Sequence, residues 1–339
     1  MDAHPKILII RLSSIGDIVL TTPIIRCIKT QIPKVQVHYL TKANNAIILN
    51  NNPYVDRIIT FNGSLSETIK LLKKENYTYV IDLHKQIRSF IIRLRLFRPS
   101  KTFNSLRIKK WLFVKWKLDK LPEKHIVDRY FEATKGLDYN IVNDEKGLDY
   151  FLADEDYISP DALPLSFQDG YIAVVVGSKH QTKQIPTSKL IQLCQGIKKS
   201  IVLLGDKNDR QKAIEVENAV GARVFNACGA YNLNQTSSLI ANSVGVITPD
   251  TGLMHIAAAL KKNTISVWGN TVPQFGMYPY FPKDSKAKVY IFEKKGLACR
   301  PCSKLGFKEC PKKHFECMLS IDFDEIISIA NEWEQDRDK

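Results

Sequence analysis

The 339-residue sequence lacks any apolar run that approaches the roughly 20 residues of a membrane-spanning helix. Its N-terminal region offers only four consecutive aliphatic residues, Ile7 to Ile10, before Arg11, which is too few for the core of a signal peptide. Acidic residues are also scarce: 35 Asp and Glu stand against 49 Lys and Arg, a formal net charge of +14. We therefore expect a soluble cytoplasmic protein whose partners are anionic, such as nucleic acid, phosphorylated ligands or an acidic membrane surface.

Cysteines are few, and most of them are gathered in one place. Of the seven, four lie at Cys299, Cys302, Cys310 and Cys317, with His314 among them. The odd total and the expected location argue against a disulfide framework. The spacing contains one Cys-x2-Cys pair but not the second pair that is typical of a structural zinc site. A bound metal, buried free thiols and a redox-active pair all remain open for this cluster.

The length of the chain predicts two domains, because it exceeds what one hydrophobic core usually serves. Short apolar runs alternate with helical patterns in both halves, and a Pro- and Gly-containing stretch at 159–170 separates them. Expected strands of the first half are 7–12, 35–41, 57–61 and 79–84, and those of the second half begin with 171–177. This alternation predicts an α/β fold of two Rossmann-like domains that face each other across a cleft.

The segment VITPDTGLMHIAAAL at 246–260 places Asp250, Thr251 and Gly252 between an expected strand and an expected helix. Asp-Thr-Gly also occurs in aspartic proteases, but their chemistry needs two such aspartates, and their fold is all-β. The carboxyl end of a strand is where open α/β sheets bind ligands, and amides at the start of a helix favour anions. His255 would lie one turn into this helix. An ordinary strand-to-helix turn is the alternative.

Three further loops follow expected strands. Ser13, Ser14, Gly16 and Asp17 come after the first one, where Asp17 suits either a helix cap or a general base. Ser178 and Lys183 follow the strand at 171–177 and suit a diphosphate or a solvated basic loop. Asp209 follows a further strand and suits ribose hydroxyls or a helix N-cap.

The segment 85–120 combines twelve Lys and Arg with one acid, Asp119, and many bulky apolar residues. The spacing predicts a helix face formed by Phe90, Ile91, Leu94 and Phe97, surrounded by Arg88, Arg93, Arg95 and Arg98. This pattern is typical of segments that lie at the interface of an anionic membrane. Nucleic acid is the competing partner, although the aromatic residues form no recognised nucleic-acid-binding signature.

Two segments, IIRLSSIGDIVLTTPIIRCIK and VITPDTGLMHIAAALKKNTISVWG, resemble the signature motifs of glycosyltransferase family 9, the ADP-heptose:lipopolysaccharide heptosyltransferases. The resemblance covers most of the chain and implies a GT-B fold. An acceptor-binding domain would span residues 1–160 and a nucleotide-sugar-binding domain 171–321, and a helix over 322–339 would cross back to the first domain. The implied enzyme inverts the anomeric centre, uses ADP-heptose and needs no metal or other cofactor. Its acceptor would be a lipid-anchored, anionic lipopolysaccharide core at the cytoplasmic face of the inner membrane.

The resemblance also assigns roles to the matching residues. Asp17 matches the catalytic base, and its loop, Ser13, Ser14 and Gly16, belongs to the acceptor side. The residues that match the donor site are Ser178 and Lys183 for the diphosphate, Asp209 for the ribose, Asp250 for the sugar, and Thr251, Gly252 and His255 in the phosphate-facing motif.

The sequence departs from the family pattern at two positions of the donor site. Ile185 stands where the family usually has Trp, and Asp209 is one carbon shorter than the usual Glu. Another nucleotide sugar or another glycan acceptor is therefore the alternative function. A non-catalytic basic protein that binds nucleic acid is the alternative from a different class.

Overall fold

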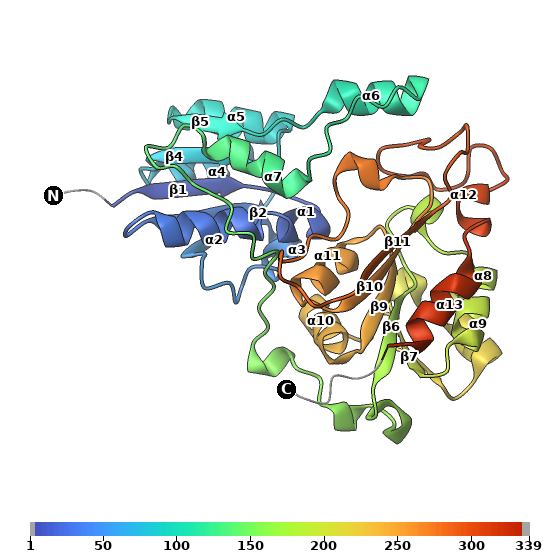
Figure 1. Cartoon of the computed structure of the whole chain (residues 1–339). Helices are drawn as coiled ribbons and strands as arrows, with labels where there is room; N and C mark the ends of the chain where they lie inside the picture. The colour runs from blue at the N-terminus through green and yellow to red at the C-terminus, as the bar shows by residue number, and fades with distance from the viewer. Residues whose placement is uncertain (1–3, 334–339) are drawn as a thin grey trace. The chain divides into compact units, whose positions relative to one another are not determined.

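The computed structural model describes residues 4–333, which form two compact units. Unit 1 comprises Met1–Leu106 and Lys124–Phe151, and unit 2 comprises Arg107–Glu123 and Leu152–Lys339. Each unit contains one parallel β-sheet with helices on both faces (Figure 1). The predicted α/β fold of two Rossmann-like domains is thus confirmed. No helix within residues 4–333 is long and apolar enough to cross a membrane.

The sheet of unit 1 has the strand order β3-β2-β1-β4-β5, and all its strands are parallel. Its strands are β1 (Lys6–Ile10), β2 (Gln36–Lys42), β3 (Arg57–Phe61), β4 (Tyr79–Asp82) and β5 (Ser100–Thr102). Central β1 pairs with β2 and β4, so that Ile10 lies beside Leu40 on one side and Asp82 on the other. The loops that leave these three strands therefore emerge at the same edge of the sheet.

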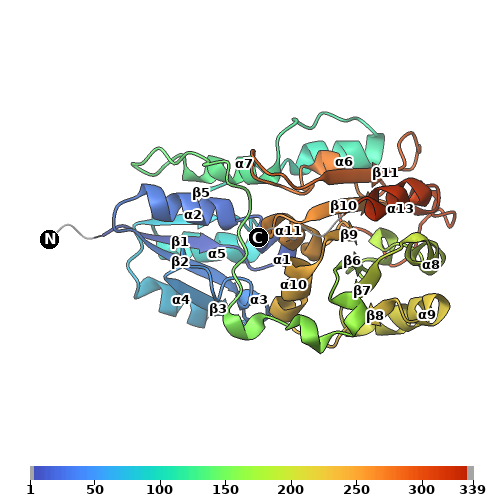
Figure 2. The same cartoon turned by 60° about the horizontal axis from the view of Figure 1, so that its bottom comes forward.

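Helices cover both faces of this sheet. They are α1 (Ile15–Val19), α2 (Thr22–Gln31), α3 (Ala43–Ala46), α4 (Leu65–Lys73), α5 (Ile87–Leu96), α7 (Ile126–Tyr130) and the 3₁₀ helix η1 (Phe131–Thr134). Leu8 and Ile10 of β1 pack with Leu72 of α4 and Ile92 of α5 in one buried cluster. Figures 1 and 2 show α2 on the opposite face. Burial of both faces explains why the strands read as nearly continuous aliphatic runs.

The sheet of unit 2 has the strand order β11-β10-β9-β6-β7-β8 and is also parallel throughout. Its strands are β6 (Tyr171–Val175), β7 (Ser200–Leu204), β8 (Val224–Asn226), β9 (Gly245–Pro249), β10 (Asn263–Trp268) and β11 (Val289–Glu293). Because β6 lies between β9 and β7, the loops after these three strands meet at one edge.

The helices of unit 2 include one from the first half of the chain. They are α6 (Arg107–Trp116), α8 (Thr187–Gly196), α9 (Arg210–Val220), α10 (Leu233–Asn242), α11 (Gly252–Ala259), α12 (Glu316–Leu319) and α13 (Phe323–Asn331). Short 3₁₀ helices are η2 (Asp154–Asp156), η3 (Pro160–Ala162), η4 (Leu165–Phe167), η5 (Gln181–Lys183), η6 (Lys207–Asp209) and η7 (Pro273–Phe275). Figure 2 shows α8, α9 and α13 on one face of the sheet and α10 and α11 on the other.

Helix α6 belongs to unit 2, although the boundary expected from the sequence assigned residues 1–160 to the first domain. It packs on unit 2, where the ring of Phe113 meets that of Phe275 edge-on at 6.1 Å. Lys117 at the end of this helix donates hydrogen bonds to the carbonyls of Cys299 and Pro301, at 3.1 and 2.7 Å. The first half of the chain therefore contributes one helix to the second unit.

The last described helix, α13, packs within unit 2. Phe323, Ile326 and Ala330 are buried in its core, and Trp333 follows them at 2% exposure. The helix expected over 322–339 was predicted to cross back to the first domain. The described part of it lies against α8, and residues 334–339 lie outside the described residues.

Candidate functional site

Asp17 is held by its own loop at the carboxyl end of β1. The backbone N–H and the hydroxyl of Ser14 both donate to its Oδ2, at 3.1 and 2.7 Å. Its Oδ1 forms an ion pair with Arg11 at 2.5 Å. Arg11 also donates to the carbonyl of Ser13 at 2.8 Å and to that of Leu83. The carboxylate is therefore fixed by hydrogen bonds on both of its oxygens.

This environment keeps Asp17 ionised. Burial disfavours the charged form, but the charge of Arg11 and the hydrogen bonds from Ser14 outweigh it, so the pKa of Asp17 lies below its usual value. Arg11 was not singled out from the sequence. The available signal was its position, since it is the charged residue that directly follows a buried aliphatic strand.

In unit 2, Lys183 and Asp250 come together from different loops. The ammonium of Lys183 lies 2.6 Å from Oδ2 of Asp250, and both side chains are mostly buried. The hydroxyl of Thr271, which follows β10, donates to the same oxygen at 2.8 Å. Thr271 was also missed by the sequence analysis. The pair places one cation and one anion at the carboxyl edge of the sheet, where α/β folds bind ligands.

The Asp-Thr-Gly loop leads directly into α11. Thr251 is the N-cap residue in an extended conformation, and the helix begins at Gly252 without an acidic residue in its first turn. The first N–H groups of a helix have no partners within it and favour an anion. His255 is 2% exposed, on a helix that is buried nearly all round.

Ser178 and Lys183 belong to one loop after β6. The side-chain amide of Gln184 donates to the carbonyl of Ser178 at 2.8 Å and so closes this loop. Thr182 exchanges hydrogen bonds with the backbone of Phe307, which ties the loop to the segment after β11. The position of Lys183 is thus set from both ends.

Asp209 approaches the same loop from the end of β7. Its Oδ2 accepts a hydrogen bond from the N–H of Asp206 at 2.9 Å. The carboxylate of Asp209 lies so close to Gly177 that a Cβ atom on residue 177 would be 1.8 Å from Oδ2. Only glycine therefore allows Asp209 its place beside the residue that precedes Ser178. Burial raises the pKa of Asp209 above its usual value.

The structure brings the expected residues together in two groups, one in each unit. Unit 2 gathers six of the donor-site candidates at the edge formed by β6, β7 and β9, namely Ser178, Lys183, Asp209, Asp250, Thr251 and Gly252. Unit 1 holds Ser13, Ser14, Gly16 and Asp17 at the end of β1.

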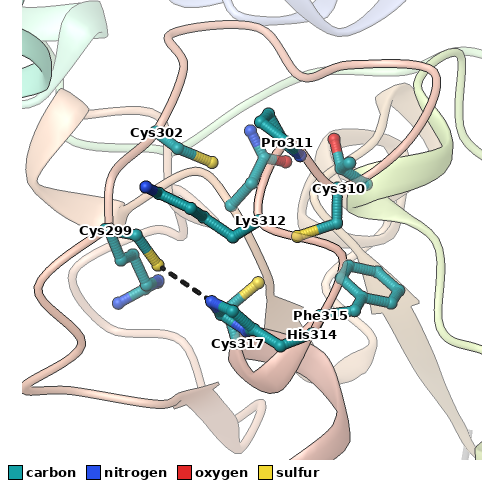
Figure 3. A pocket seen from close by; sticks show the side chains of 11 residues that line it. Cys299, Cys302, Cys310, Pro311, Lys312, His314, Phe315 and Cys317 are labelled. Atoms are coloured by element: carbon teal, nitrogen blue, oxygen red, sulfur yellow. Dashed lines mark hydrogen bonds between the residues drawn. The ribbon is translucent and has the colours of Figure 1, made fainter.

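The cysteine cluster lines a small cavity of about 10 Å³ in unit 2 (Figure 3). Its four cysteines are free thiols, and Sγ of Cys299 lies 3.8 Å from Nε2 of His314. Burial raises the pKa of Cys317 to about 12. Within residues 4–333 no three His, Cys, Asp or Glu side chains form a group that could hold a metal ion.

Arg300, within the Cys-x2-Cys pair, connects this cluster to the Asp250 loop. Its guanidinium donates to the carbonyls of Gly269 and Thr271, at 2.6 and 2.7 Å, and pairs with Glu293 at 2.7 Å. The cysteine-rich segment thus supports the backbone of the loop after β10, and the hydroxyl of Thr271 in this loop bonds Asp250.

Known proteins with similar sequences belong to one family. The sequence model of glycosyltransferase family 9 (heptosyltransferase) matches residues 66–318. Lipopolysaccharide heptosyltransferase 1 of Campylobacter coli is 26% identical over 350 residues, which cover 96% of this chain and 98% of that protein.

Solved structures agree with these sequence matches. A glycosyl transferase family 9 protein from Veillonella parvula DSM 2008 has a TM-score of 0.76 at 18% identity, with 97% of each chain covered. The E. coli ADP-heptose lps heptosyltransferase II has a TM-score of 0.71 at 18% identity, with 96% of this chain and 97% of that chain covered. The chain therefore belongs to glycosyltransferase family 9 and is a glycosyltransferase with the GT-B fold.

Proposed function

We propose that this protein transfers a heptose from ADP-heptose to the inner core of a lipopolysaccharide acceptor, with inversion and without a metal ion. The names of its relatives support the substrates, since both lipopolysaccharide and ADP-heptose occur in them. The observation that carries the proposal is the ionised Asp17 at the carboxyl end of β1. Unit 1 then binds the acceptor and unit 2 binds the nucleotide sugar.

Asp17 acts as the general base in this reaction. It removes the proton of an acceptor hydroxyl while that oxygen attacks the anomeric carbon of the donor. A positioned general base contributes about 10²- to 10⁴-fold. The hydrogen bonds from Ser14 and the ion pair with Arg11 favour this role, because they fix the direction of the carboxylate before the acceptor arrives.

Residues of unit 2 stabilise the leaving ADP. Negative charge develops on its β-phosphate as the sugar departs, and the ammonium of Lys183 and the amides of Thr251 and Gly252 neutralise it. Lys183 is already turned towards the Asp-Thr-Gly loop by its ion pair with Asp250. On donor binding the ammonium moves to the diphosphate and the carboxylate of Asp250 to the sugar hydroxyls, while Ser178 and Asp209 contact the diphosphate and the ribose.

Helix α5 carries the proposed contact with the cytoplasmic face of the inner membrane. Its outer stripe consists of Ile87, Phe90 and Leu94 together with Phe97 at the C-cap of the helix, with exposed fractions of 79, 52, 56 and 79%. Ile91, predicted for this face, is half-buried, and Ile87 takes its place. The opposite side of the helix packs on the sheet. Four arginines flank the stripe, which suits anionic lipid headgroups.

A ligand screen by thermal unfolding tests the function and its alternatives. ADP at saturating concentration should raise the unfolding temperature, whereas UDP and GDP should not, because a ligand stabilises the fold that binds it. A transfer assay with ADP-heptose and heptose-deficient lipopolysaccharide then tests the reaction. Stabilisation by UDP or GDP alone would identify another nucleotide sugar. Stabilisation only by a short DNA duplex, lost steeply with salt, would contradict the proposal and indicate a nucleic-acid-binding protein.

A further inference from the structure

His84 lies in the turn after β4, next to the loop that carries Asp17. Strands β4 and β1 are parallel neighbours, and Leu83 extends their pairing by donating its N–H to the carbonyl of Ile10 at 3.0 Å. The side chain of Arg11 donates to the carbonyl of Leu83. His84 therefore directly follows a residue that is bonded to the ion-pair partner of Asp17.

The backbone of this turn is fixed independently of any ligand. Oδ1 of Asp82 accepts hydrogen bonds from the N–H groups of His84 and Lys85, at 3.0 and 2.9 Å. Helix α5 begins shortly afterwards at Ile87. The imidazole thus projects from a rigid turn between two secondary-structure elements, which is the kind of support that a precise binding residue needs.

The imidazole itself has no hydrogen-bond partner among residues 4–333. Its Nδ1 is buried without a partner, and Nε2 makes no hydrogen bond to another described residue. Native proteins pair nearly all of their buried polar groups, so each exception requires an explanation. At the ligand-binding edge of a parallel sheet, a half-buried ring whose nitrogens bond no other described residue is available to a ligand.

The surroundings of His84 determine which kind of partner suits it. Burial and then the positive charge of Arg11, followed by Lys42 and Arg88, lower the pKa of the imidazole to about 4, although Asp17 acts in the opposite direction. The ring is therefore neutral near pH 7, with one nitrogen that donates and one that accepts. A hydroxyl group, which also donates and accepts, matches this ring better than an anion or a cation does.

We propose that His84 binds the acceptor by hydrogen-bonding a sugar hydroxyl group beside Asp17. The inference rests on the proposed function, in which the acceptor binds to unit 1. Lys42, at the end of β2, and Arg88, in the first turn of α5, are exposed cations that attract the anionic groups of the same acceptor. Together the ends of β1, β2 and β4 and the first turn of α5 then supply a base, a hydroxyl-binding ring and two cations for one anionic sugar.

Two substitutions at His84 separate binding from packing. His84→Leu keeps much of the side-chain volume and removes both nitrogens, whereas His84→Gln retains a donor and an acceptor near the position of Nε2. The acceptor probe is deacylated lipopolysaccharide from a heptose-deficient strain, and the donor is ADP-heptose. We expect His84→Leu to raise the acceptor KM about tenfold, the size of one lost hydrogen bond with its partner left unpaired. The donor KM should stay unchanged, and His84→Gln should recover most of the loss.

A matched control comes from the same sheet. His38 in β2 is buried and pairs with the hydroxyl of Tyr77 at 3.1 Å, so His38→Leu should lower the unfolding temperature and leave the acceptor KM unchanged. An acceptor KM within twofold of wild type for His84→Leu would overturn the inference. So would equal increases of the acceptor and donor KM values, or a Gln variant as impaired as the Leu variant.

A binding measurement separates this inference from the proposed function. Isothermal titration of the deacylated acceptor, without donor, reports glycan binding whether or not transfer occurs. If the wild type binds the glycan but transfers no heptose, the proposed function fails, and a tenfold weaker binding by His84→Leu still supports the role of His84. If the wild type transfers heptose and His84→Leu binds the glycan normally, only the inference about His84 is overturned. A wild type that binds no glycan would contradict both.

Discussion

The ammonium of Lys183 and the carboxylate of Asp250 form an ion pair at 2.6 Å, although they belong to loops that follow different strands of unit 2. The pairing is possible because β6 and β9 are neighbours in a parallel sheet, so that their carboxyl ends coincide. Each charge therefore neutralises the other. The proposed donor carries a diphosphate that can replace Asp250 beside Lys183 and a sugar whose hydroxyl groups can bond Asp250.

Replacing Lys183 by Met should weaken ADP binding about 10- to 100-fold, the usual range for a hydrogen bond to a charged group. The measurement is isothermal titration with ADP. Because the single change also leaves Asp250 unpaired and mostly buried, the control is the double variant Lys183→Met/Asp250→Asn. If the double variant binds ADP as the wild type does, Lys183 is not a phosphate-binding residue.

Asp17→Asn preserves the size of the side chain and removes its ability to accept a proton. We expect turnover to fall by about 10²- to 10⁴-fold, the usual contribution of a general base. ADP affinity should remain near normal, because the expected nucleotide site lies in unit 2. The loss of the ion pair with Arg11 also affects the fold, so the unfolding temperature is recorded in parallel. Unchanged turnover in a folded variant would remove Asp17 as the base.

The positions of the loops were predictable from the sequence, but their side-chain partners were not. Alternating apolar runs identify β1, β6, β7 and β9, and a parallel sheet necessarily places the following loops at one edge. Side-chain directions are not revealed by the periodicity of a sequence. They determine that Arg11 pairs with Asp17, and that Thr271 bonds Asp250. His255 shows the same limit, because α11 is apolar nearly all round and its pattern does not distinguish one face from another.

The division of the chain into units was also only partly predictable. Composition predicts a division near 159–170, whereas unit 2 resumes at Leu152. Helix α6 also packs against Phe275, far away in the sequence. A contact between Phe113 and Phe275 leaves no local signal, since aromatic residues in a basic helix indicate a membrane surface rather than a partner within the chain. Tertiary packing of such a helix overrides what its own residues indicate.

Gly245→Ala tests where the end of α13 is packed. A Cβ atom at residue 245 would lie 2.3 Å from the indole ring of Trp333, which is 2% exposed. Such overpacking costs about 1–3 kcal/mol, and we expect a lower unfolding temperature for unit 2 in calorimetry. Adding Trp333→Leu makes room for the new methyl group, so the double variant should be less affected than the sum of the single changes. If the losses of stability in the two single variants simply added up in the double variant, this contact would be contradicted.

The stripe on α5 should control binding to anionic vesicles. Phe90→Ser/Leu94→Ser removes two exposed apolar side chains, each worth about 1.5–3 kcal/mol when buried, so partitioning should fall at least tenfold. Co-sedimentation with vesicles of phosphatidylglycerol and phosphatidylcholine measures it, and vesicles of phosphatidylcholine alone should bind the wild type weakly. Leu165→Ser is the matched control, because Leu165 is 81% exposed but belongs to unit 2 and lies outside the basic segment. Equal binding by both variants would contradict the assignment.

The pH below which kcat/KM falls should depend on Arg11. In the wild type the pKa of Asp17 is lowered, so the carboxylate stays ionised down to a pH below its ordinary pKa of 3.8, and its ion pair contributes stability above that pH. Arg11→Met removes the main opposing effect, and burial then raises the pKa of Asp17. The acid limb of kcat/KM should therefore move to higher pH in Arg11→Met and remain lower in Arg11→Lys, which keeps the charge.

Arg11→Met also removes the hydrogen bonds to Ser13 and Leu83, so circular dichroism must show that the variant is folded at each pH of the profile. The raised pKa of Asp17 should also change how the stability of Arg11→Met depends on pH. An ionised carboxylate without its cation partner is destabilising once it is buried, so protonation of Asp17 removes a destabilising charge in this variant. The variant should therefore lose less stability than the wild type when the pH falls through 4. Identical acid limbs for the wild type and the Met variant would show that Asp17 does not set the ionisation required for turnover.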